Sequence, residues 1–214
     1  MITIHGVFGS PFVRALRIAL DEKGLPWAWA PFQLGEHKQE PYLSLHPFGK
    51  IPAMVDDGFA LYETQAMLRH IDRKAPAPAL MPTDPHRAAR ADQILAIVDC
   101  YLWPSGRGIG FNRLIAPRIG APVNEQAVLD SIEPTKVTLA ALAALAGNQP
   151  FLTGETITLA DIAVLPLTDM LAKTPEGGAI LAEHPNLLAW LERMRERPSV
   201  RNSALAPEKV LAAA

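Results

Sequence analysis

The chain has 214 residues, of which 49% are hydrophobic and 20% charged, so it can bury a substantial core and is not disordered by composition. Its 20 basic and 22 acidic residues give a formal net charge of -2, which argues against a nucleic-acid partner. The sequence has no polybasic segment that would attach it to a membrane surface, so we expect neither nucleic acid nor membrane as a partner.

Cys100 is the single cysteine, so the chain cannot form an internal disulfide, which is typical of proteins from a reducing compartment. The first residues alternate as in a strand and lack the basic start and apolar run of a signal peptide. The longest weakly polar stretch, 137–147, is too short to cross a bilayer. These observations predict a cytoplasmic protein.

The chain begins with a strand–helix–strand pattern. Residues 2–8 alternate and are rich in β-branched side chains, which predicts a strand. Apolar residues between positions 13 and 20 predict a helix that ends at Lys23 and Gly24. Residues 27–32 alternate again, so we expect two parallel strands joined by a right-handed crossover.

The next segment predicts a hairpin followed by a helix. A polar stretch leads into a short surface helix within residues 35–43. Residues 51–55 and 59–62 are strand-like, and the Asp-Asp-Gly turn at 56–58 favours a hairpin between them. From Glu63 onward the apolar spacing becomes helical.

The rest of the chain is predicted to be helical. Four prolines within 75–85 indicate a linker between two domains. Helical patterns then occupy residues 86–103, 125–146 and 187–197. Thr158 and Asp161 form a near capping box at the start of a further helix. Residues 106–122 are poorly periodic, and no element is assigned to them.

Several short strings, each weak alone, together resemble the glutathione S-transferase family in order and spacing over nearly the whole chain. They occupy residues 9–15, 35–38, 47–53, 61–66, 151–154 and 158–161. The resemblance implies an α/β thioredoxin-like N-terminal domain (βαβ-ββα) followed by an all-α C-terminal domain. Residues 1–76 would form the glutathione-binding domain, 77–85 the linker, and 86–214 the helical domain with the electrophile pocket.

Within the family, the strings are most similar to serine-type enzymes, in particular phi- and theta-like bacterial members. The resemblance also implies a homodimer. Two positions depart from the family pattern: His46 replaces a frequent asparagine, and Thr64 replaces a frequent serine. Threonine keeps the hydroxyl, so we expect the role of that position to be retained.

The resemblance assigns the γ-glutamyl end of glutathione to Glu63 and Thr64. Glu63 would neutralise the ammonium group, and the hydroxyl and backbone N–H of Thr64 would hold the adjacent carboxylate, because a helix start is a favourable anion site. Taken alone, these two residues fit a helix cap without a ligand better than a binding site. The upstream Ile51-Pro52 pair favours the binding site.

Ile51 and Pro52 resemble the cis-proline of the family, which places a strand edge beside the cysteine of glutathione, where backbone groups would pair with the peptide. Because few X-Pro bonds are cis, the alternative is an edge-strand proline in trans. His37, Lys38 and Lys50 are expected to meet the glycine carboxylate. For His37 and Lys38 the alternative is a solvated polar loop.

Ser10 is the candidate catalytic residue. It lies between the first strand and the first helix, where the thioredoxin fold carries the first cysteine of its Cys-x-x-Cys motif. The pair here is Ser10 and Val13, so dithiol–disulfide chemistry is not available. The hydroxyl would instead donate to the glutathione sulfur and stabilise the thiolate. The alternative is that Ser10 only caps the helix.

The second-substrate pocket is expected to contain Phe12 from the first domain and Tyr101, Arg107 and Phe111 from the second. Ordinary packing is the alternative for each of them. Cys100 lies in an apolar helix, so we expect a buried, unreactive thiol.

The predicted function is conjugation of the glutathione thiolate to an apolar electrophile, as in detoxification, with glutathione as co-substrate and no metal. One alternative is a glutathione-dependent peroxidase, dehalogenase or isomerase on the same fold. A second is a non-catalytic glutathione-binding or regulatory protein, against which the complete set of Ser10, Ile51-Pro52 and Glu63-Thr64 argues.

Overall fold

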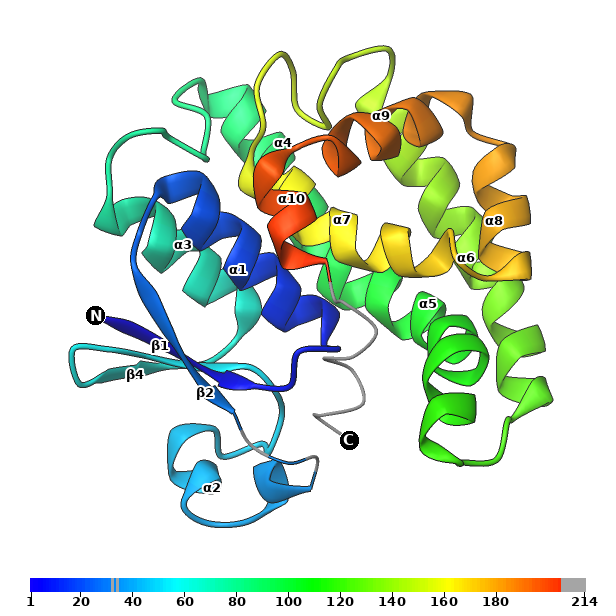
Figure 1. The fold of residues 1–214 in the computed structure, drawn as a ribbon. Coiled ribbons are helices and arrows are strands. Elements are labelled where there is room, and N and C mark those ends of the chain that lie inside the picture. Colours follow the sequence, from blue (N-terminus) through cyan, green and yellow to red (C-terminus); the bar gives the residue numbers. More distant parts are fainter. Residues whose placement is uncertain (32, 34, 205–214) are drawn as a thin grey trace. The chain divides into compact units, whose positions relative to one another are not determined.

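The computed structural model describes residues 1–31, 33 and 35–204, and it divides into two compact units. The first unit contains residues Met1–Ala79 and, from the end of the chain, helix α10 (Pro198–Ser203). The second unit is Leu80–Glu196 and is helical (Figure 1). The predicted fold class, a thioredoxin-like domain followed by an all-helical domain, is confirmed.

The first unit is built on a mixed four-stranded sheet with the order β2-β1-β3-β4. Strand β1 pairs with β2 in parallel and with β3 antiparallel, and β3 and β4 form the hairpin. The strands are β1 (Ile2–Gly6), β2 (Trp27–Pro31), β3 (Ala53–Asp56) and β4 (Phe59–Leu61). Asp57 and Gly58 both have positive φ angles, 48° and 89°, as a tight two-residue hairpin turn requires.

Two helices lie side by side on one face of this sheet (Figure 1). The helical segments are α1 (Pro11–Lys23), η1 (Glu36–Lys38), α2 (Tyr42–Leu45) and α3 (Thr64–Lys74). Helix α1 ends as predicted, with Gly24 in the left-handed conformation at φ 61°. The apolar faces of α1 and α3 are buried, so the core of this unit lies between these two helices and the sheet.

Helix α10 packs on α1 through polar contacts. Arg14 Nε donates to Ser203 Oγ at 3.1 Å, and Arg17 donates to the backbone carbonyl of Ser203 at 3.3 Å. At the start of α10, the guanidinium of Arg197 makes two hydrogen bonds to Glu22, at 2.8 and 2.6 Å. The sequence-based boundaries place α10 in the helical domain, whereas its contacts tie it to α1 of the first unit.

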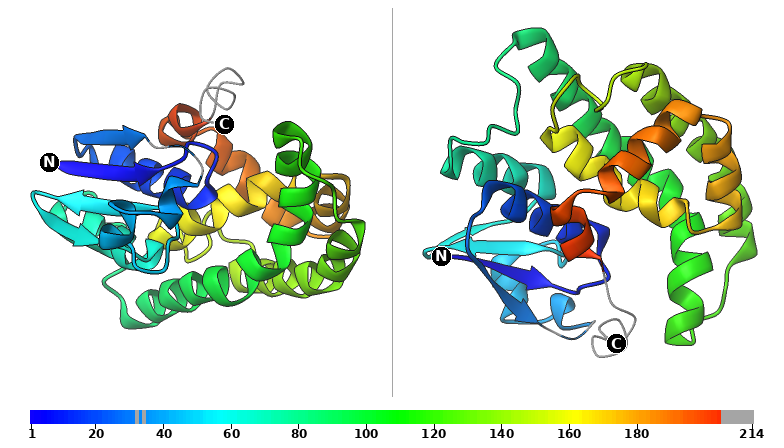
Figure 2. Two further views of the ribbon diagram at one scale, coloured as in Figure 1. Left: turned by 90° about the horizontal axis from the view of Figure 1, so that it is seen from below. Right: turned by 45° about the horizontal axis from the view of Figure 1, so that its top comes forward.

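The second unit surrounds a buried central helix, α7 (Figure 2). Its helical segments are α4 (Pro85–Ile97), η2 (Val98–Leu102), α5 (Trp103–Gly110), η3 (Phe111–Ile115), η4 (Ala116–Ile119), α6 (Glu125–Ala146), α7 (Leu159–Leu171), α8 (Pro175–Ala182) and α9 (Pro185–Arg195). Helix α7 packs against α4, α5, α8 and α9, and nearly every side chain it carries is buried, most of them apolar. No helix in the described residues is long and apolar enough to span a membrane.

The segment left unassigned by the sequence, 106–122, continues the helical run as α5, η3 and η4. The three glycines of α5, Gly106, Gly108 and Gly110, allow this helix to approach its neighbours closely. A Cβ at Gly106 would lie 3.2 Å from Leu171 of α7, and one at Gly108 would lie 2.6 Å from the carbonyl oxygen of Ala127 in α6. These glycines occupy positions that face other helices, where an apolar side chain would otherwise be expected. The apolar periodicity is therefore missing from the sequence, although the helix is present.

The predicted capping box at the start of α7 is confirmed. Asp161 Oδ2 accepts hydrogen bonds from the backbone nitrogen and the hydroxyl of Thr158, at 2.8 and 2.9 Å. Its other oxygen accepts from the backbone nitrogen of Leu152 at 2.8 Å. Because Asp161 is fully buried, these bonds compensate a large desolvation cost, and burial nevertheless raises its pKa.

Candidate functional site

The predicted site residues of the first unit emerge at one edge of the sheet. In the strand register, Gly6 of β1 pairs with Pro31 of β2, and Met54 of β3 pairs with Leu61 of β4. The carboxyl ends of β1, β2 and β4 therefore meet the amino end of β3 at this edge. The segments that follow or precede these ends carry all the predicted glutathione-site residues, which are Ser10, His37, Lys38, Lys50, Ile51, Pro52, Glu63 and Thr64.

Ser10 occupies the N-cap of α1 and is 8% exposed. Its backbone nitrogen donates to the carbonyl of Val7 at 3.1 Å, which fixes the turn after β1. Its Oγ accepts from the backbone nitrogen of Val13 at 3.4 Å, which is long for a hydrogen bond. The hydroxyl can therefore still donate a hydrogen bond to an atom placed before the helix, where the positive end of the helix dipole lies.

The Ile51–Pro52 peptide bond is cis, as the sequence predicts. Gly6 shows how close Pro52 lies to the start of α1. A Cβ at Gly6 would be 2.7 Å from Cγ2 of Val13 and 3.7 Å from Cα of Pro52. Only a glycine allows this approach, so the end of β1 holds α1 and the cis-proline against each other.

Glu63 precedes the first residue of α3 and has a positive φ of 69° with ψ 113°. A non-glycine residue in this region is strained by about 1–3 kcal/mol, and such strain is concentrated at functional sites. The Glu63 carboxylate is exposed, and within the described residues it makes no capping hydrogen bond to α3. The chain therefore presents this carboxylate outward, with Thr64 next to it at the helix start.

His37, Lys38 and Lys50 are brought together by a tight turn at 46–50. Lys38 Nζ donates to the carbonyl of Gly49 at 2.7 Å, and the hydroxyl of Tyr42 donates to the carbonyl of Lys50 at 2.6 Å. Burial lowers the pKa of His37, and the charges of Lys38 and Lys50 lower it further. Lys38 and Lys50 thus form a cationic corner at the sheet edge, suited to an anionic group, with the uncharged ring of His37 beside them.

Three predicted pocket residues of the second unit, Tyr101, Arg107 and Phe111, line one groove of about 850 Å³ between α5 and α6. Tyr101 is 62% exposed, and the guanidinium of Arg107 lies 6.0 Å from the ring centre of Trp103. The fourth predicted residue, Phe12, belongs to α1 of the first unit.

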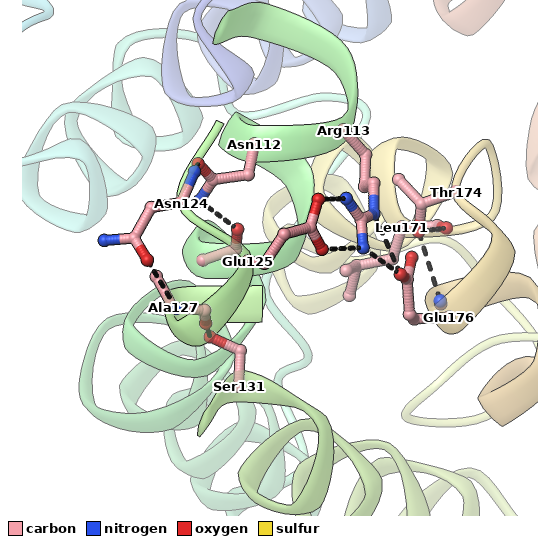
Figure 3. A network of polar contacts seen from close by, with 11 residues as sticks. Asn112, Arg113, Asn124, Glu125, Ala127, Ser131, Leu171, Thr174 and Glu176 are labelled. Atoms are coloured by element: carbon pink, nitrogen blue, oxygen red, sulfur yellow. Dashed lines mark hydrogen bonds and ion pairs between the residues drawn. The ribbon is translucent and has the colours of Figure 1, made fainter. Parts of the chain in front are cut away.

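Asn112 and Asn124, which line this groove, belong to a network of polar contacts (Figure 3). Asn112 accepts from the backbone nitrogen of Asn124 at 2.8 Å and thereby fixes the loop before α6. Arg113 joins Glu125 in the first turn of α6 to Glu176 in the first turn of α8, with bonds of 2.7 and 2.8 Å (Figure 3). Both glutamates also lie where the helix dipole favours a negative charge, so this network stabilises the wall of the groove.

Comparison with known proteins gives the same assignment for both halves of the chain. Residues 4–79 match the family model described as the glutathione S-transferase N-terminal domain, and residues 92–198 match that of the C-terminal domain. The chain is 31% identical over 211 residues to glutathione S-transferase 3 of Zea mays, covering 96% of this chain and 94% of that protein.

The chain belongs to the glutathione S-transferase family.

Solved structures of the family agree. Glutathione transferase F7 from Populus trichocarpa has a TM-score of 0.87 at 28% identity and covers 98% of this chain and 99% of its own. Glutathione S-transferase I from maize, in complex with an atrazine glutathione conjugate, has a TM-score of 0.84 at 26% identity, covering 100% of this chain and 99% of that one. The prediction of a glutathione transferase is confirmed at the level of the family.

One expectation about the second unit is wrong: Cys100 is exposed, not buried. The buried series of this helical run continues from Ile94 through Val98 to Leu102. Cys100 is two residues from Val98 and therefore lies on the opposite side of the helix. The apolar composition of the segment suggested burial, but the helical period decides the face.

Sequence reasoning missed the aromatic residues next to the candidate site. Tyr42 supports the carbonyl of Lys50, and His46, Phe48 and Tyr62 form a cluster of ring contacts with one another. The sequence signal was the recurrence of aromatic residues at 42, 46, 48 and 62, on both sides of the hairpin.

Proposed function

We propose that this chain transfers glutathione to small apolar electrophiles, with Ser10 stabilising the glutathione thiolate. The observation that carries the proposal is the strand register, which directs Ser10, the Ile51–Pro52 bond and the Glu63–Thr64 pair to one sheet edge. Glutathione is an extended peptide with charged groups at both ends, and this edge offers complementary groups in the corresponding order.

In this proposal Glu63 and Thr64 bind the γ-glutamyl end. The outward carboxylate of Glu63 would neutralise the ammonium group, and the strained backbone at Glu63 supports a functional role for this residue. Thr64, as the first residue of α3, would offer its hydroxyl and backbone N–H to the carboxylate.

The opposite end of the peptide would lie over the cationic corner. Lys38 and Lys50 would neutralise the glycine carboxylate, and the uncharged ring of His37 would donate a hydrogen bond to it. Between the two ends, the backbone of Ile51 and Pro52 would pair with the cysteine residue of glutathione, as in the addition of a strand to a sheet edge.

The hydroxyl of Ser10 would donate a hydrogen bond to the glutathione sulfur and so stabilise its thiolate form. A free thiol with a pKa of about 8.5 is only about 3% ionised at pH 7, and lowering that pKa by about two units would raise the thiolate fraction more than 20-fold. A thiolate of lower pKa is also a weaker nucleophile. With a Brønsted slope of about 0.45, this loss cancels most of the gain in thiolate fraction, so the net increase in rate is roughly threefold. Positioning of the thiolate against the electrophile must therefore contribute more.

The electrophile would contact Phe12, Tyr101, Arg107 and Phe111, the last three of which line the groove of the second unit. Because the maize relative holds an atrazine glutathione conjugate, we propose an aromatic substrate that carries a leaving group. The thiolate sulfur would form a bond to the ring carbon, and the leaving group would depart with its electron pair. The thiol proton would pass to solvent.

Within the family we propose a serine-type enzyme of the phi- and theta-like kind, active as a homodimer in cytoplasmic detoxification. The serine at position 10 and the plant relatives support the type, and the single cysteine supports a reducing compartment. A peroxidase, dehalogenase or isomerase would use the same glutathione site and differ only in the second substrate.

The test is glutathione binding by calorimetry, together with the pH dependence of thiolate absorbance, in the wild type, Ser10→Ala and the control Ser44→Ala. Ser44 is an exposed serine of α2, so its substitution removes a hydroxyl from the same unit without altering the site. We expect glutathione to bind all three proteins with similar affinity. In Ser10→Ala alone, the thiol pKa should rise by about two units, and turnover of a chlorodinitrobenzene-type substrate at pH 7 should fall several-fold.

Raising the pH should restore part of the turnover of Ser10→Ala, because more thiolate then forms without the hydroxyl. An unshifted thiol titration would show that Ser10 acts only as a helix cap. Absence of glutathione binding in the wild type would contradict the transferase itself and leave a glutathione-independent protein on this fold.

A further inference from the structure

His46 is a buried histidine between two segments of the candidate site. His46 is 3% exposed. Its ring stacks on that of Tyr62, with the ring centres 4.7 Å apart and an angle of 28° between the planes. Phe48 contacts both rings edge-on, at 6.2 and 6.1 Å. Tyr42 lies 6.4 Å away on nearly parallel planes. We call these four residues the aromatic cluster.

The polar atoms of the His46 ring do not explain its burial. Its Nδ1 is buried and has no hydrogen-bond partner among the described residues. A buried polar atom without a hydrogen-bond partner is unfavourable, so stacking on the faces of the ring must stabilise its buried position. The same burial makes Nδ1 inaccessible to a ligand, which excludes direct binding of glutathione through this atom.

The aromatic cluster connects the two ends of the proposed glutathione site. His46 begins the tight turn that carries Lys50, and its carbonyl accepts from the backbone nitrogen of Gly49 at 2.8 Å. Tyr62 directly precedes Glu63, the residue with the strained positive φ, and Thr64. The stack of His46 on Tyr62 therefore joins the segment for the glycine carboxylate to the segment for the γ-glutamyl group.

We propose that His46 is a positioning residue that sets the spacing between Lys50 and Glu63 by stacking on Tyr62. This inference rests on the proposed glutathione site. His46 acts through Tyr62 and the turn and does not touch glutathione itself. Its ring provides the packing, so another flat aromatic ring replaces it, whereas an aliphatic side chain of similar size does not.

The charges around His46 require its ring to be neutral for this role. Burial lowers its pKa, Glu63 and the backbone of His46 itself oppose this effect, and Lys38 and Lys50 lower the pKa further. The other titratable groups against the ring are the hydroxyls of Tyr42 and Tyr62. Because the folded site disfavours the protonated ring, its packing is complete at neutral pH and is weakened as the pH falls below the ordinary histidine value of about 6.5.

The test compares glutathione binding by calorimetry at pH 7.5 and pH 5.5 in the wild type, His46→Leu, His46→Phe and Phe59→Ala. Phe59→Ala is the control, because Phe59 makes a ring contact with His70 at 5.8 Å in the same unit but outside the aromatic cluster. At pH 7.5 we expect the glutathione Kd of His46→Leu to rise roughly three- to tenfold, the size of one aromatic pair. His46→Phe and Phe59→Ala should bind like the wild type.

At pH 5.5 the wild type should bind more weakly than His46→Phe, which lacks the titrating ring. His37 is present in both proteins, so the difference between them reports His46 alone. Hydrogen exchange provides a second readout: the amides of residues 61–64 should exchange faster in His46→Leu than in His46→Phe.

Equal binding and equal exchange in His46→Leu and the wild type would overturn the inference. Loss of binding in His46→Phe would overturn it as well, because the ring nitrogens would then be essential. If the wild type itself bound no glutathione, the proposed function would fail and the inference would fail with it. If the wild type binds glutathione while His46→Leu behaves like it, only the inference about His46 fails and the proposed function stands.

Discussion

The indole nitrogen of Trp190 in α9 donates a hydrogen bond of 2.8 Å to Oδ1 of Asp161, at the start of α7. Both residues are buried, and the same oxygen also accepts from the backbone nitrogen of Leu152. One carboxylate therefore joins three segments of the second unit: the loop before α7, α7 itself and α9. Two of its four donors are backbone groups, the nitrogens of Leu152 and Thr158.

Replacing Asp161 by asparagine should destabilise the protein, because an amide nitrogen cannot accept the bonds that one carboxylate oxygen accepts. We expect a loss of about 1–3 kcal/mol for each donor left without an acceptor, measured as the free energy of unfolding in urea. The matched control is Asp130→Asn on the exposed side of α6, where a change within about 0.5 kcal/mol is expected. Equal stability of both variants would contradict the role of Asp161.

A methyl group at Gly108 should separate α5 from α6. Its Cβ would clash with Ser131 Oγ and with the carbonyl oxygen of Ala127, so we expect Gly108→Ala to cost about 1–3 kcal/mol. Gly178→Ala in α8 is the control, since its Cβ would meet only the carbonyl of Ala172 at 3.7 Å. That variant should gain up to about 1 kcal/mol from helix propensity. Chemical denaturation of both variants checks the opposite signs.

Asp56 should make stability fall in acid. Burial would raise its pKa, but hydrogen bonds from Lys74 and His70, each at 2.8 Å, outweigh burial and hold the pKa below its usual value. A carboxylate with a lowered folded pKa stabilises the protein above the unfolded value of about 3.9, and that stability is lost as the pH falls below it. Thermal melting of the wild type and Lys74→Met should therefore differ at pH 6, and the difference should shrink as the pH falls below about 3.9. A difference that stays constant with pH would contradict the ion pair.

Glu63→Gly should separate stability from binding. Glycine accepts a positive φ without strain, so the melting temperature should stay equal or rise, although glycine also has the larger unfolded-state entropy. Glutathione affinity should fall at least tenfold, because the proposed partner of its ammonium group is removed. The control is Glu63→Gln, which keeps the strain and loses only the charge. A drop in melting temperature with unchanged affinity would show that Glu63 is purely structural.

The sequence predicted most of the first unit because its elements have strong local signals. Alternating residues predicted β1 and β2, an Asp-Gly turn predicted the hairpin, and Gly24 predicted the end of α1. The cis bond at Pro52 has no local signal of its own. It was predicted through the family resemblance.

The parts that sequence reasoning missed depend on contacts between distant segments. Gly106, Gly108 and Gly110 interrupt the apolar period, although each provides packing space against α6 or α7. The role inferred for His46 depends on Tyr62, sixteen residues further along and on the other side of a hairpin. Such pairings become visible only when the hairpin has brought its two ends together.

The return of α10 to α1 has a consequence for how the chain is synthesised. The bonds from Arg14, Arg17 and Glu22 to α10 join residues separated by 175 to 189 positions. When the ribosome has released the sheet and its first helices, the partners of these three side chains have not yet been translated. The first unit can therefore be completed only after the whole second unit has been made.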